Sequence, residues 1–235
     1  MGLPIQSAPT YTCVLPSNGD EVKFRPFLVK EQKVLILARE SEDTKQSLNA
    51  VKDLISAVTF NKVDADELAM IDLEYLFLKV RAVSVGETIE LTLSCKANDC
   101  MATEKVQINL DEINAKGEMP STNTVMISET VGIEVRTPKV KDIKSTNQNQ
   151  DDVDVGLDVV KNSIVAIFDE EQVYDKSDMS KSDLDEFIDS LTYKQLELLG
   201  DWFDDLPKLS HTVEWKCKTC DVENLRELEG INSFF

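Results

Sequence analysis

The chain has 235 residues, 42% of them hydrophobic, which is enough for one large globular domain or two small ones. Its 44 acidic residues against 25 basic ones give a formal net charge of -19, which repels polyphosphates and anionic lipid surfaces. We therefore expect no nucleic acid and no membrane among its partners. No run approaches the roughly 20 apolar residues of a membrane span, and residues 1–7 lack the pattern of a signal peptide. These features predict a protein of the reducing cytoplasm.

The first part of the chain predicts a hairpin followed by helices. Residues 11–27 contain two short extended runs around a turn-rich segment, which is typical of a β-hairpin. Residues 30–40 and 44–60 carry apolar side chains at helical spacing. Asp64 followed by Glu67 indicates a capping box at the start of a third helix, whose last two turns are apolar almost all round.

Four of the five cysteines form two close pairs, Cys95 with Cys100 and Cys217 with Cys220. The flanking segments alternate between apolar and polar residues, as strands do. These segments are residues 88–94, 104–110, 212–216 and 222–228. Each pair is therefore expected at the tip of a hairpin.

Two such tips supply the four thiolates that a structural zinc site requires. The sequence thus predicts a zinc ribbon, with Zn2+ as a structural cofactor bound by Cys95, Cys100, Cys217 and Cys220. Unrelated reduced thiols on hairpin turns are the alternative, and disulfides are a third interpretation. A redox pair is disfavoured because strands flank the motif. His211 could replace one ligand or be a surface or packing residue, and Cys13 is expected to be a small apolar side chain in a strand.

The segment between the two cysteine pairs is strongly acidic. Residues 125–135 predict a further hairpin, and residues 144–154 are polar and turn-rich. From 151 to 189 there are 13 acidic residues and three lysines, a density that suggests calcium, but Val153 and Val155 stand where an EF-hand loop requires oxygen ligands. We interpret this stretch as a solvated helical face.

Two helices are expected to follow the acidic stretch. Ser182 precedes acidic residues that suit a helix N-terminus, and Thr192 with Gln195 forms a capping box. The second helix should end at Pro207.

Catalytic signatures are absent from the sequence. There is one histidine, no glycine-rich phosphate loop and no nucleophile elbow. A zinc ion with four sulfur ligands has no open coordination position and would hold the fold together. We therefore expect a non-enzymatic protein with no small-molecule substrate.

Five segments carry a resemblance to a known family. They are residues 15–19, 24–27, 30–38, 72–78 (continued by Arg81 and 84–87) and 228–235. In their order and combination they resemble the baseplate family of T-even bacteriophages. The resemblance is strong in the first hundred residues, returns from about Leu196 onward and is weak across the acidic segment. It contributes no catalytic residue.

That resemblance implies a baseplate hub subunit or a factor that assembles the hub of a contractile tail. Its partners would be other baseplate hub proteins. It would be located in the virion tail baseplate, in the infected host cytoplasm during assembly, or in both. The resemblance does not itself imply zinc.

The sequence as a whole predicts an α+β fold in three parts. Residues 1–87 are expected to form a hairpin and a helical lobe. Residues 88–143 with 208–235 are expected to form a zinc-ribbon-like antiparallel β lobe, and residues 144–207 an acidic loop and helical insertion.

Aromatic side chains are the predicted protein contacts, because aromatics dominate interface anchors. The candidates are Tyr75, Phe77, Trp202, Phe203, Phe234 and Phe235. Exposing a terminal Phe side chain costs about 1.5–3 kcal/mol, so Phe234 and Phe235 should be buried in this chain or in a partner. The alternative function is a zinc-ribbon adaptor that binds transcription machinery.

Overall fold

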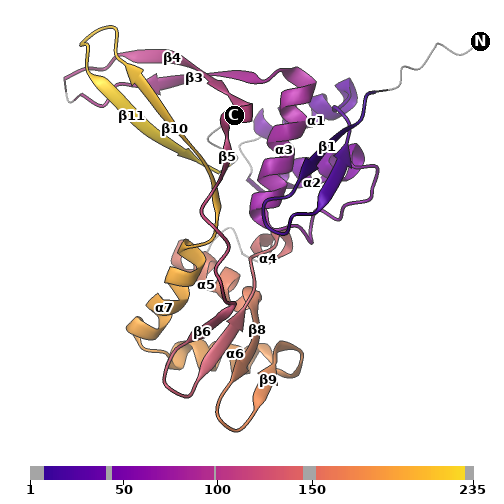
Figure 1. Cartoon of the computed structure of the whole chain (residues 1–235), viewed down its shortest axis with the longest axis vertical. Helices are drawn as coiled ribbons and strands as arrows, with labels where there is room; N and C mark the ends of the chain where they lie inside the picture. Colours follow the sequence, from indigo (N-terminus) through magenta and orange to yellow (C-terminus); the bar gives the residue numbers. More distant parts are fainter. Residues whose placement is uncertain (1–7, 41–43, 98, 145–151, 231–235) are drawn as a thin grey trace, which may run out of the picture. The chain divides into compact units, whose positions relative to one another are not determined.

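The protein is described from a computed structural model, which describes residues 8–40, 44–97, 99–144 and 152–230. It divides into two compact units of mixed α and β structure (Figure 1). Unit 1 comprises Met1–Ala65, Ile71–Lys116 and Lys208–Phe235, and unit 2 comprises Asp66–Met70 and Gly117–Pro207. Among the described helices, none is long and apolar enough to cross a membrane.

Unit 1 begins with a hairpin and three helices. Strands β1 (Tyr11–Val14) and β2 (Glu21–Phe24) pair antiparallel, as predicted. They precede α1 (Val29–Glu40), α2 (Thr44–Val58) and α3 (Met70–Val85). Helix α2 ends two residues earlier than predicted, because Phe60 and Asn61 adopt left-handed backbone conformations with φ of 60° and 56°.

A buried carboxylate ties the hairpin turn to α3. Asp72 is 2% exposed and accepts hydrogen bonds from the Ser17 backbone N–H at 2.9 Å and from the Ser17 hydroxyl. Burial raises the pKa of Asp72, while the two hydrogen bonds act in the opposite direction. Seven apolar residues of α3 are buried, as expected for a helix with little polar face, whereas Val85 near its end is 60% exposed.

The remaining strands of unit 1 form two ribbons that share one core with α3. Strands β3 (Thr88–Ser94) and β4 (Thr103–Asn109) pair antiparallel, followed by a 3-10 turn (Leu110–Glu112). Strand β10 (Lys208–Lys216) pairs with both β11 (Glu223–Glu229) and the short β5 (Asn114–Lys116). The shared core consists of Leu78, Ala82, Ile89, Leu93, Ile108, Leu110, Ile113, Leu209, Val213 and Leu228.

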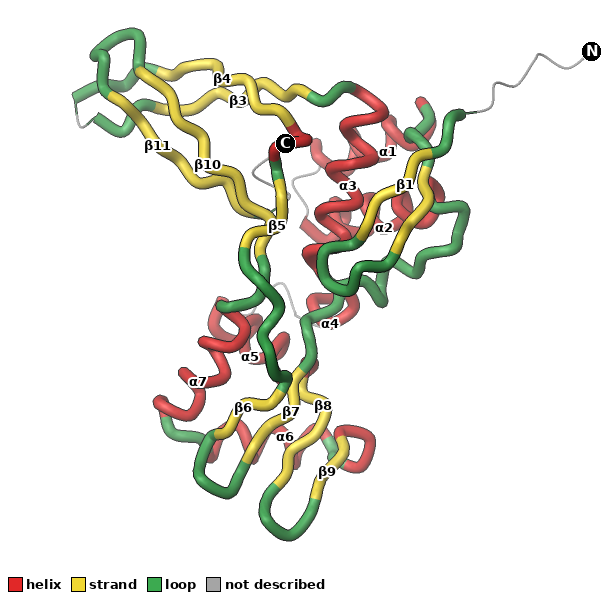
Figure 2. The backbone as a smooth tube through the Cα atoms, in the orientation of Figure 1, coloured by secondary structure: helices red, strands yellow, loops and turns green. Residues whose placement is uncertain are grey.

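Unit 2 is a four-stranded antiparallel sheet in the order β6-β7-β8-β9, with helices α5 to α7 gathered on one face of it (Figure 2). The strands are β6 (Thr124–Met126), β7 (Gly132–Val135), β8 (Ile164–Phe168) and β9 (Val173–Asp175). The helices are α4 (Val140–Lys144), α5 (Asp152–Ser163), α6 (Lys181–Ser190) and α7 (Tyr193–Asp204), with a 3-10 turn at Lys176–Asp178. Its core consists of Val125, Ile127, Ile133, Val135, Ile164, Ile167, Leu184, Ile188, Leu199 and Trp202.

Helix caps explain where α6 and α7 begin. The predicted capping box of Thr192 with Gln195 is confirmed. The helix start predicted at Ser182 is one residue late, because α6 begins at Lys181. Ser180 is the N-cap, and its side chain accepts from the Asp183 N–H while Asp183 accepts from the Ser180 N–H.

The predicted capping box of Asp64 with Glu67 is also wrong. Helix α3 starts at Met70, because the preceding residues pair with another segment of unit 2. The Val140 N–H donates to Leu68 O at 3.0 Å. Glu67 instead accepts from Lys139 at 2.8 Å and from Lys141 at 2.6 Å.

The acidic segment is less helical than predicted, and the chain groups differently from the three expected parts. Strands β8 and β9 lie within residues 151–189, because β8 is a continuous apolar run that pairs with β7. Residues 117–143 group with 144–207, since β6 and β7 complete that sheet. The helical lobe and the β lobe belong to one unit because α3 contributes to the core of both.

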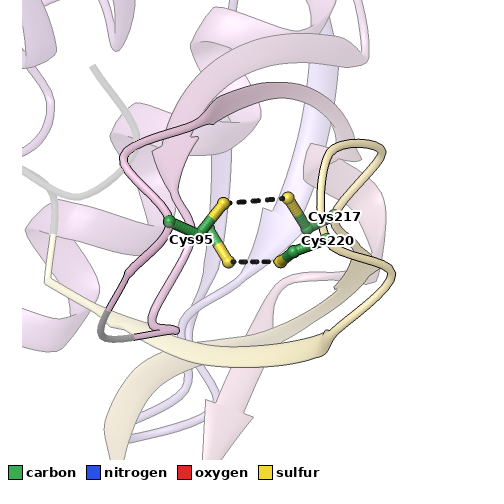
Figure 3. Close-up of side chains that lie close together, drawn as sticks. Cys95, Cys217 and Cys220 are labelled. Carbon is green, nitrogen blue, oxygen red and sulfur yellow. Dashed lines mark hydrogen bonds between the residues drawn. The ribbon is translucent and has the colours of Figure 1, made fainter.

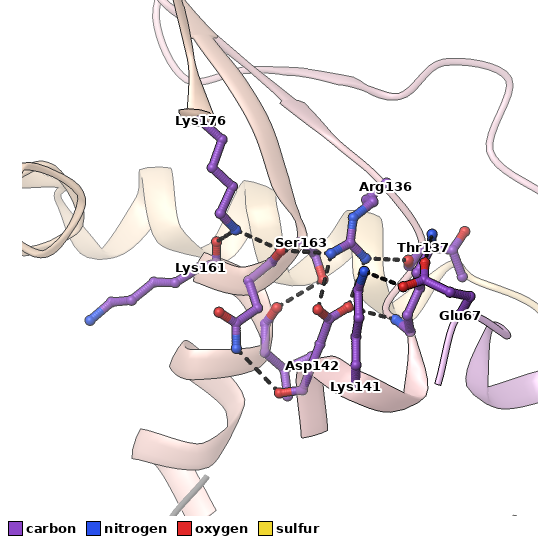
Figure 4. Close-up of polar contacts among 11 residues, drawn as sticks. Glu67, Arg136, Thr137, Lys141, Asp142, Lys161, Ser163 and Lys176 are labelled. Carbon is purple, nitrogen blue, oxygen red and sulfur yellow. Dashed lines mark hydrogen bonds and ion pairs between the residues drawn. The ribbon is translucent and has the colours of Figure 1, made fainter. Parts of the chain in front are cut away.

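An ion pair between the buried Asp142 and the partly exposed Arg136 organises the polar side of unit 2 (Figure 4). Arg136 donates to the two carboxylate oxygens of Asp142 at 2.7 and 3.0 Å, and Asp142 also accepts from the Lys139 N–H at 2.7 Å. The second guanidinium nitrogen of Arg136 donates to Asn162 O at 2.9 Å. Burial alone would raise the pKa of Asp142, but the hydrogen bonds from Arg136 and Lys139 outweigh it and hold that pKa below its ordinary value.

We expect Asp142→Asn to lower the free energy of unfolding of unit 2 by about 3 kcal/mol, because it leaves Arg136 without its charged partner. Urea denaturation followed by Trp202 fluorescence, in a Trp215→Phe background, measures unit 2 separately. Asp185→Asn is the control, because Asp185 pairs with Lys161 at 2.7 Å but is 38% exposed, and it should cost much less.

The lowered pKa of Asp142 also predicts how the stability of unit 2 depends on pH. Because the folded-state pKa of Asp142 is below the ordinary value of about 3.9, its contribution is complete above about pH 4 and is lost as the pH falls through the folded-state pKa. Unit 2 should therefore lose more stability on acidification in the wild type than in Asp142→Asn. Equal losses would contradict the assignment.

Candidate metal centre

The tips of the two unit 1 ribbons bring four cysteines together. Cys95 and Cys100 lie in the turn between β3 and β4, and Cys217 and Cys220 lie in the turn between β10 and β11. The Sγ atoms of Cys95 and Cys220 are 3.6 Å apart, and those of Cys100 and Cys217 are 3.8 Å apart. All four sulfurs lie within 4.8 Å of one another, and Figure 3 shows the labelled Cys95 on one turn facing Cys217 and Cys220 on the other.

These distances fit a metal ion better than disulfides. A tetrahedron with metal–sulfur distances of about 2.3 Å has edges of about 3.8 Å, which is close to both measured separations. A disulfide requires about 2.05 Å between the sulfurs, and all five cysteines are free thiols. The geometry and the donor set are therefore compatible with a tetrahedral metal ion.

The two turns share a local architecture despite their different lengths. In each, the N–H of the first cysteine donates to the carbonyl two residues beyond the second cysteine: Cys95 to Ala102 and Cys217 to Val222, both at 2.9 Å. In the shorter turn, Asp221 adopts a left-handed backbone conformation with φ of 60°, which Asp tolerates better than most residues. The wide spacing in the first pair thus does not prevent closure.

The thiols influence one another's ionisation strongly. Backbone N–H groups of Cys220 and Thr219 lower the pKa of Cys217 to about 7. The N–H of Val222 acts to lower the pKa of Cys220, yet burial and hydrogen bonding with the other three thiols raise it to about 12. Several thiolates so close together repel one another, so ionising all four calls for a cation among them.

An ion pair reinforces the contact between the two hairpins. Glu104 of β4 accepts from the Lys218 N–H at 2.9 Å and from its Nζ at 3.2 Å. The Lys218 N–H contributes most to the lowered pKa of Glu104. This contact joins the turn after β10 to the start of β4.

The other candidate ligand and the odd thiol lie elsewhere. Of the His, Cys, Asp and Glu side chains that the structure describes, only the four cysteines form a group able to hold a metal ion. His211 is half-buried in β10 opposite Leu228. Cys13 lies in β1, and burial raises its pKa to about 11.

Two of the six predicted aromatic contacts are core residues, and two more pack against a core. Phe77 is 1% exposed and Trp202 is 7% exposed, and Trp202 donates to Thr122 O at 2.9 Å. Tyr75 and Phe203 are half-buried against the cores of units 1 and 2 respectively. Phe77 and Trp202 thus present almost no surface to a partner, while Phe234 and Phe235 lie outside the described residues.

An exposed apolar helix was missed by the sequence analysis. None of the side chains described in α1, residues 29–37, is buried, and Val29 and Leu37 are 69% and 65% exposed. Leu28, Val34 and Ile36 are also exposed. A possible signal was the near-uniform apolar content of residues 34–38, which lacks the alternation of one buried face with one polar face.

Comparison with known proteins assigns the chain to a family. Residues 8–235 match the family described as T4 bacteriophage base plate protein. The chain belongs to this family. No curated protein and no solved structure matches it. Membership implies a structural role in the virion tail baseplate, in contact with other baseplate proteins, and confirms the resemblance found in the sequence.

We expect the purified protein to bind about one divalent metal ion per chain. Cys95→Ser and Cys217→Ser should each abolish binding, because each removes one of four ligands. Cys13→Ser is the matched control and should retain the ion. Elemental analysis of the four proteins measures this directly, and metal in either cluster variant at the wild-type level would contradict the site.

Proposed function

We propose that the protein is a baseplate hub subunit or a hub assembly factor that acts through protein contacts. In this proposal a structural zinc ion holds together the β lobe of unit 1. The match over residues 8–235 carries the proposal, because a baseplate is built from protein–protein contacts. The sequence signatures of common enzymes are also missing, in line with a non-catalytic role.

Zinc is the metal that the donor set favours. Four thiolates in tetrahedral arrangement suit zinc or an iron–sulfur cluster, and the sulfur separations match a single ion of zinc size. A centre with four protein ligands leaves no position for a reacting water. Its contribution would be folding energy, since the ligands come from segments more than 100 residues apart.

Helix α1 is the best-supported contact surface. A helix of 12 residues is marginal in water, and proteins normally stabilise one by burying an apolar face. In α1, none of the aliphatic side chains that the structure describes is buried, and only Leu35 is half-buried. Several exposed aliphatic side chains on one helix are characteristic of a surface that a partner covers.

Polar contacts nevertheless fix the start of α1. Arg25 donates to both carboxylate oxygens of Glu31 at 2.8 and 2.9 Å, with the two side chains 15% and 10% exposed. Glu31 also accepts from the Leu28 N–H at 2.6 Å. The Arg25–Glu31 ion pair holds the N-terminus of α1 in place. The exposed aliphatic side chains of α1 therefore have a defined orientation within unit 1.

The charge is unevenly divided between the units. Unit 2 contains 23 acidic and 8 basic residues, a net of -15, whereas unit 1 contains 21 and 17, a net of -4. Unit 2 therefore repels polyanions and like-charged surfaces. Unit 1 carries less negative charge, and Lys30 and Lys33 are exposed beside the apolar residues of α1. An acidic partner would therefore repel unit 1 less than unit 2.

The location of the protein distinguishes the forms of this proposal. Mass spectrometry of purified virions should detect a hub subunit at a fixed ratio to other baseplate proteins. An assembly factor should be missing from virions, and its deletion should stall hub assembly. Absence from virions, normal hubs on deletion and co-purification with polymerase would overturn the proposal in favour of the transcription adaptor.

We expect Ile36→Asp with Leu37→Asp to leave unit 1 folded but to impair hub assembly. Both side chains are exposed, so the cost to stability should be small, whereas a buried interface anchor contributes about 2 kcal/mol or more to binding. Complementation of a deletion phage should fall by an order of magnitude or more.

Tyr193→Asp serves as the control, because Tyr193 is 80% exposed on α7 of unit 2. It should complement normally. If the α1 double variant complements as well as the wild type and folds normally, α1 is not a hub contact.

A further inference from the structure

Asn224 is a buried polar side chain beside the cysteine cluster. It lies in β11 and is 4% exposed. Its Nδ2 donates to Cys95 Sγ at 3.6 Å and to Val222 O at 2.9 Å, and its Oδ1 accepts from the Lys96 N–H at 2.8 Å. Both amide protons and the carbonyl oxygen are therefore used, and the Lys96 N–H together with the Val222 carbonyl fixes which way the amide group points.

These contacts join the two hairpins without passing through the sulfurs. Lys96 belongs to the turn after β3, and Val222 belongs to the turn before β11. A buried amide that satisfies backbone groups on both turns holds them in register, because leaving those groups unpaired costs about 1–3 kcal/mol each. The side chain thus aligns the hairpins whether or not an ion is present.

Backbone N–H groups act to lower the pKa of three of the thiols: those of Cys220 and Thr219 for Cys217, that of Ala102 for Cys100 and that of Val222 for Cys220. Cys95 accepts from the side chain of Asn224. N–H donors stabilise thiolate charge and set the direction of the sulfur lone pairs.

We propose that Asn224 is a positioning residue of the metal centre, which orients Cys95 Sγ toward the other three sulfurs. This inference rests on the proposed metal centre. Asn224 itself contributes no ligand. Its effect on the ion is exerted through Cys95, so loss of the amide donor should weaken one metal–sulfur bond selectively.

Two substitutions separate the amide donor from added charge. Asn224→Asp keeps the oxygen that accepts from Lys96 but replaces the donor at Cys95 with an acceptor. Asn224→Leu removes both without adding charge at similar volume. Asn114→Asp is the matched control, because Asn114 is an exposed Asn of β5 in the same lobe, with Nδ2 donating to Glu112 O at 3.2 Å.

The experiment titrates Co2+, then Zn2+ in competition, into the full-length reduced protein. Both Asn224 variants should bind about 10- to 100-fold more weakly than the wild type. Their sulfur-to-cobalt charge-transfer bands should shift, and mass spectrometry after limited alkylation should show Cys95 modified first. Asn114→Asp should behave as the wild type in all three measurements.

The outcomes separate this inference from the metal centre on which it rests. A wild type that binds neither ion would overturn the metal centre itself. Wild-type binding with unchanged affinity and spectrum in both Asn224 variants would leave the centre intact and overturn the role of Asn224. A change in Asn224→Asp alone would attribute the effect to charge and also overturn it. If Asn224→Asp fails to fold, Asn224→Leu decides.

Discussion

Unit 1 depends on one constraint: two hairpins that are far apart in the sequence must close on one another. Cys95 and Cys220 are 125 positions apart, and Cys100 and Cys217 are 117 apart, yet each pair of sulfurs lies within 4 Å. Bringing such distant segments together has a large loop-closure cost. Core packing against α3 and the contacts of Asn224 offset it, and we propose that a metal ion at the four sulfurs contributes as well. Residues 117–207, which separate the two hairpins in the sequence, belong to the other compact unit.

In this arrangement two different parts of unit 1 have two different roles. The cysteine tips organise the β lobe, whereas the exposed aliphatic residues of α1 offer the surface for a partner. The two are linked through α3, because Leu78 and Ala82 pack in the core of the β lobe and the Ser84 hydroxyl accepts a hydrogen bond at 3.0 Å from the Phe27 N–H, just before α1. The metal is therefore assigned to architecture, and function is assigned to surfaces that the architecture supports.

The sequence predicted the elements with strong local signals. Alternation of apolar and polar residues located both cysteine hairpins, and the Thr192 capping box located α7. The sequence predictions failed where contacts with distant segments determine the local structure. The apolar run of β8 carries no alternation and was lost in its acidic surroundings, and Glu67 looked like a helix cap until Lys139 and Lys141 were placed beside it. Burial of Phe77 and exposure of Leu37 are likewise decided by neighbours that composition alone does not reveal.

X-ray absorption at the zinc edge tests the central claim most directly, because it counts the atoms bound to the ion in the purified protein. The account predicts four sulfur neighbours at about 2.3 Å and no nitrogen or oxygen neighbour. A first coordination shell containing nitrogen or oxygen, or a folded protein that contains no zinc, would contradict it.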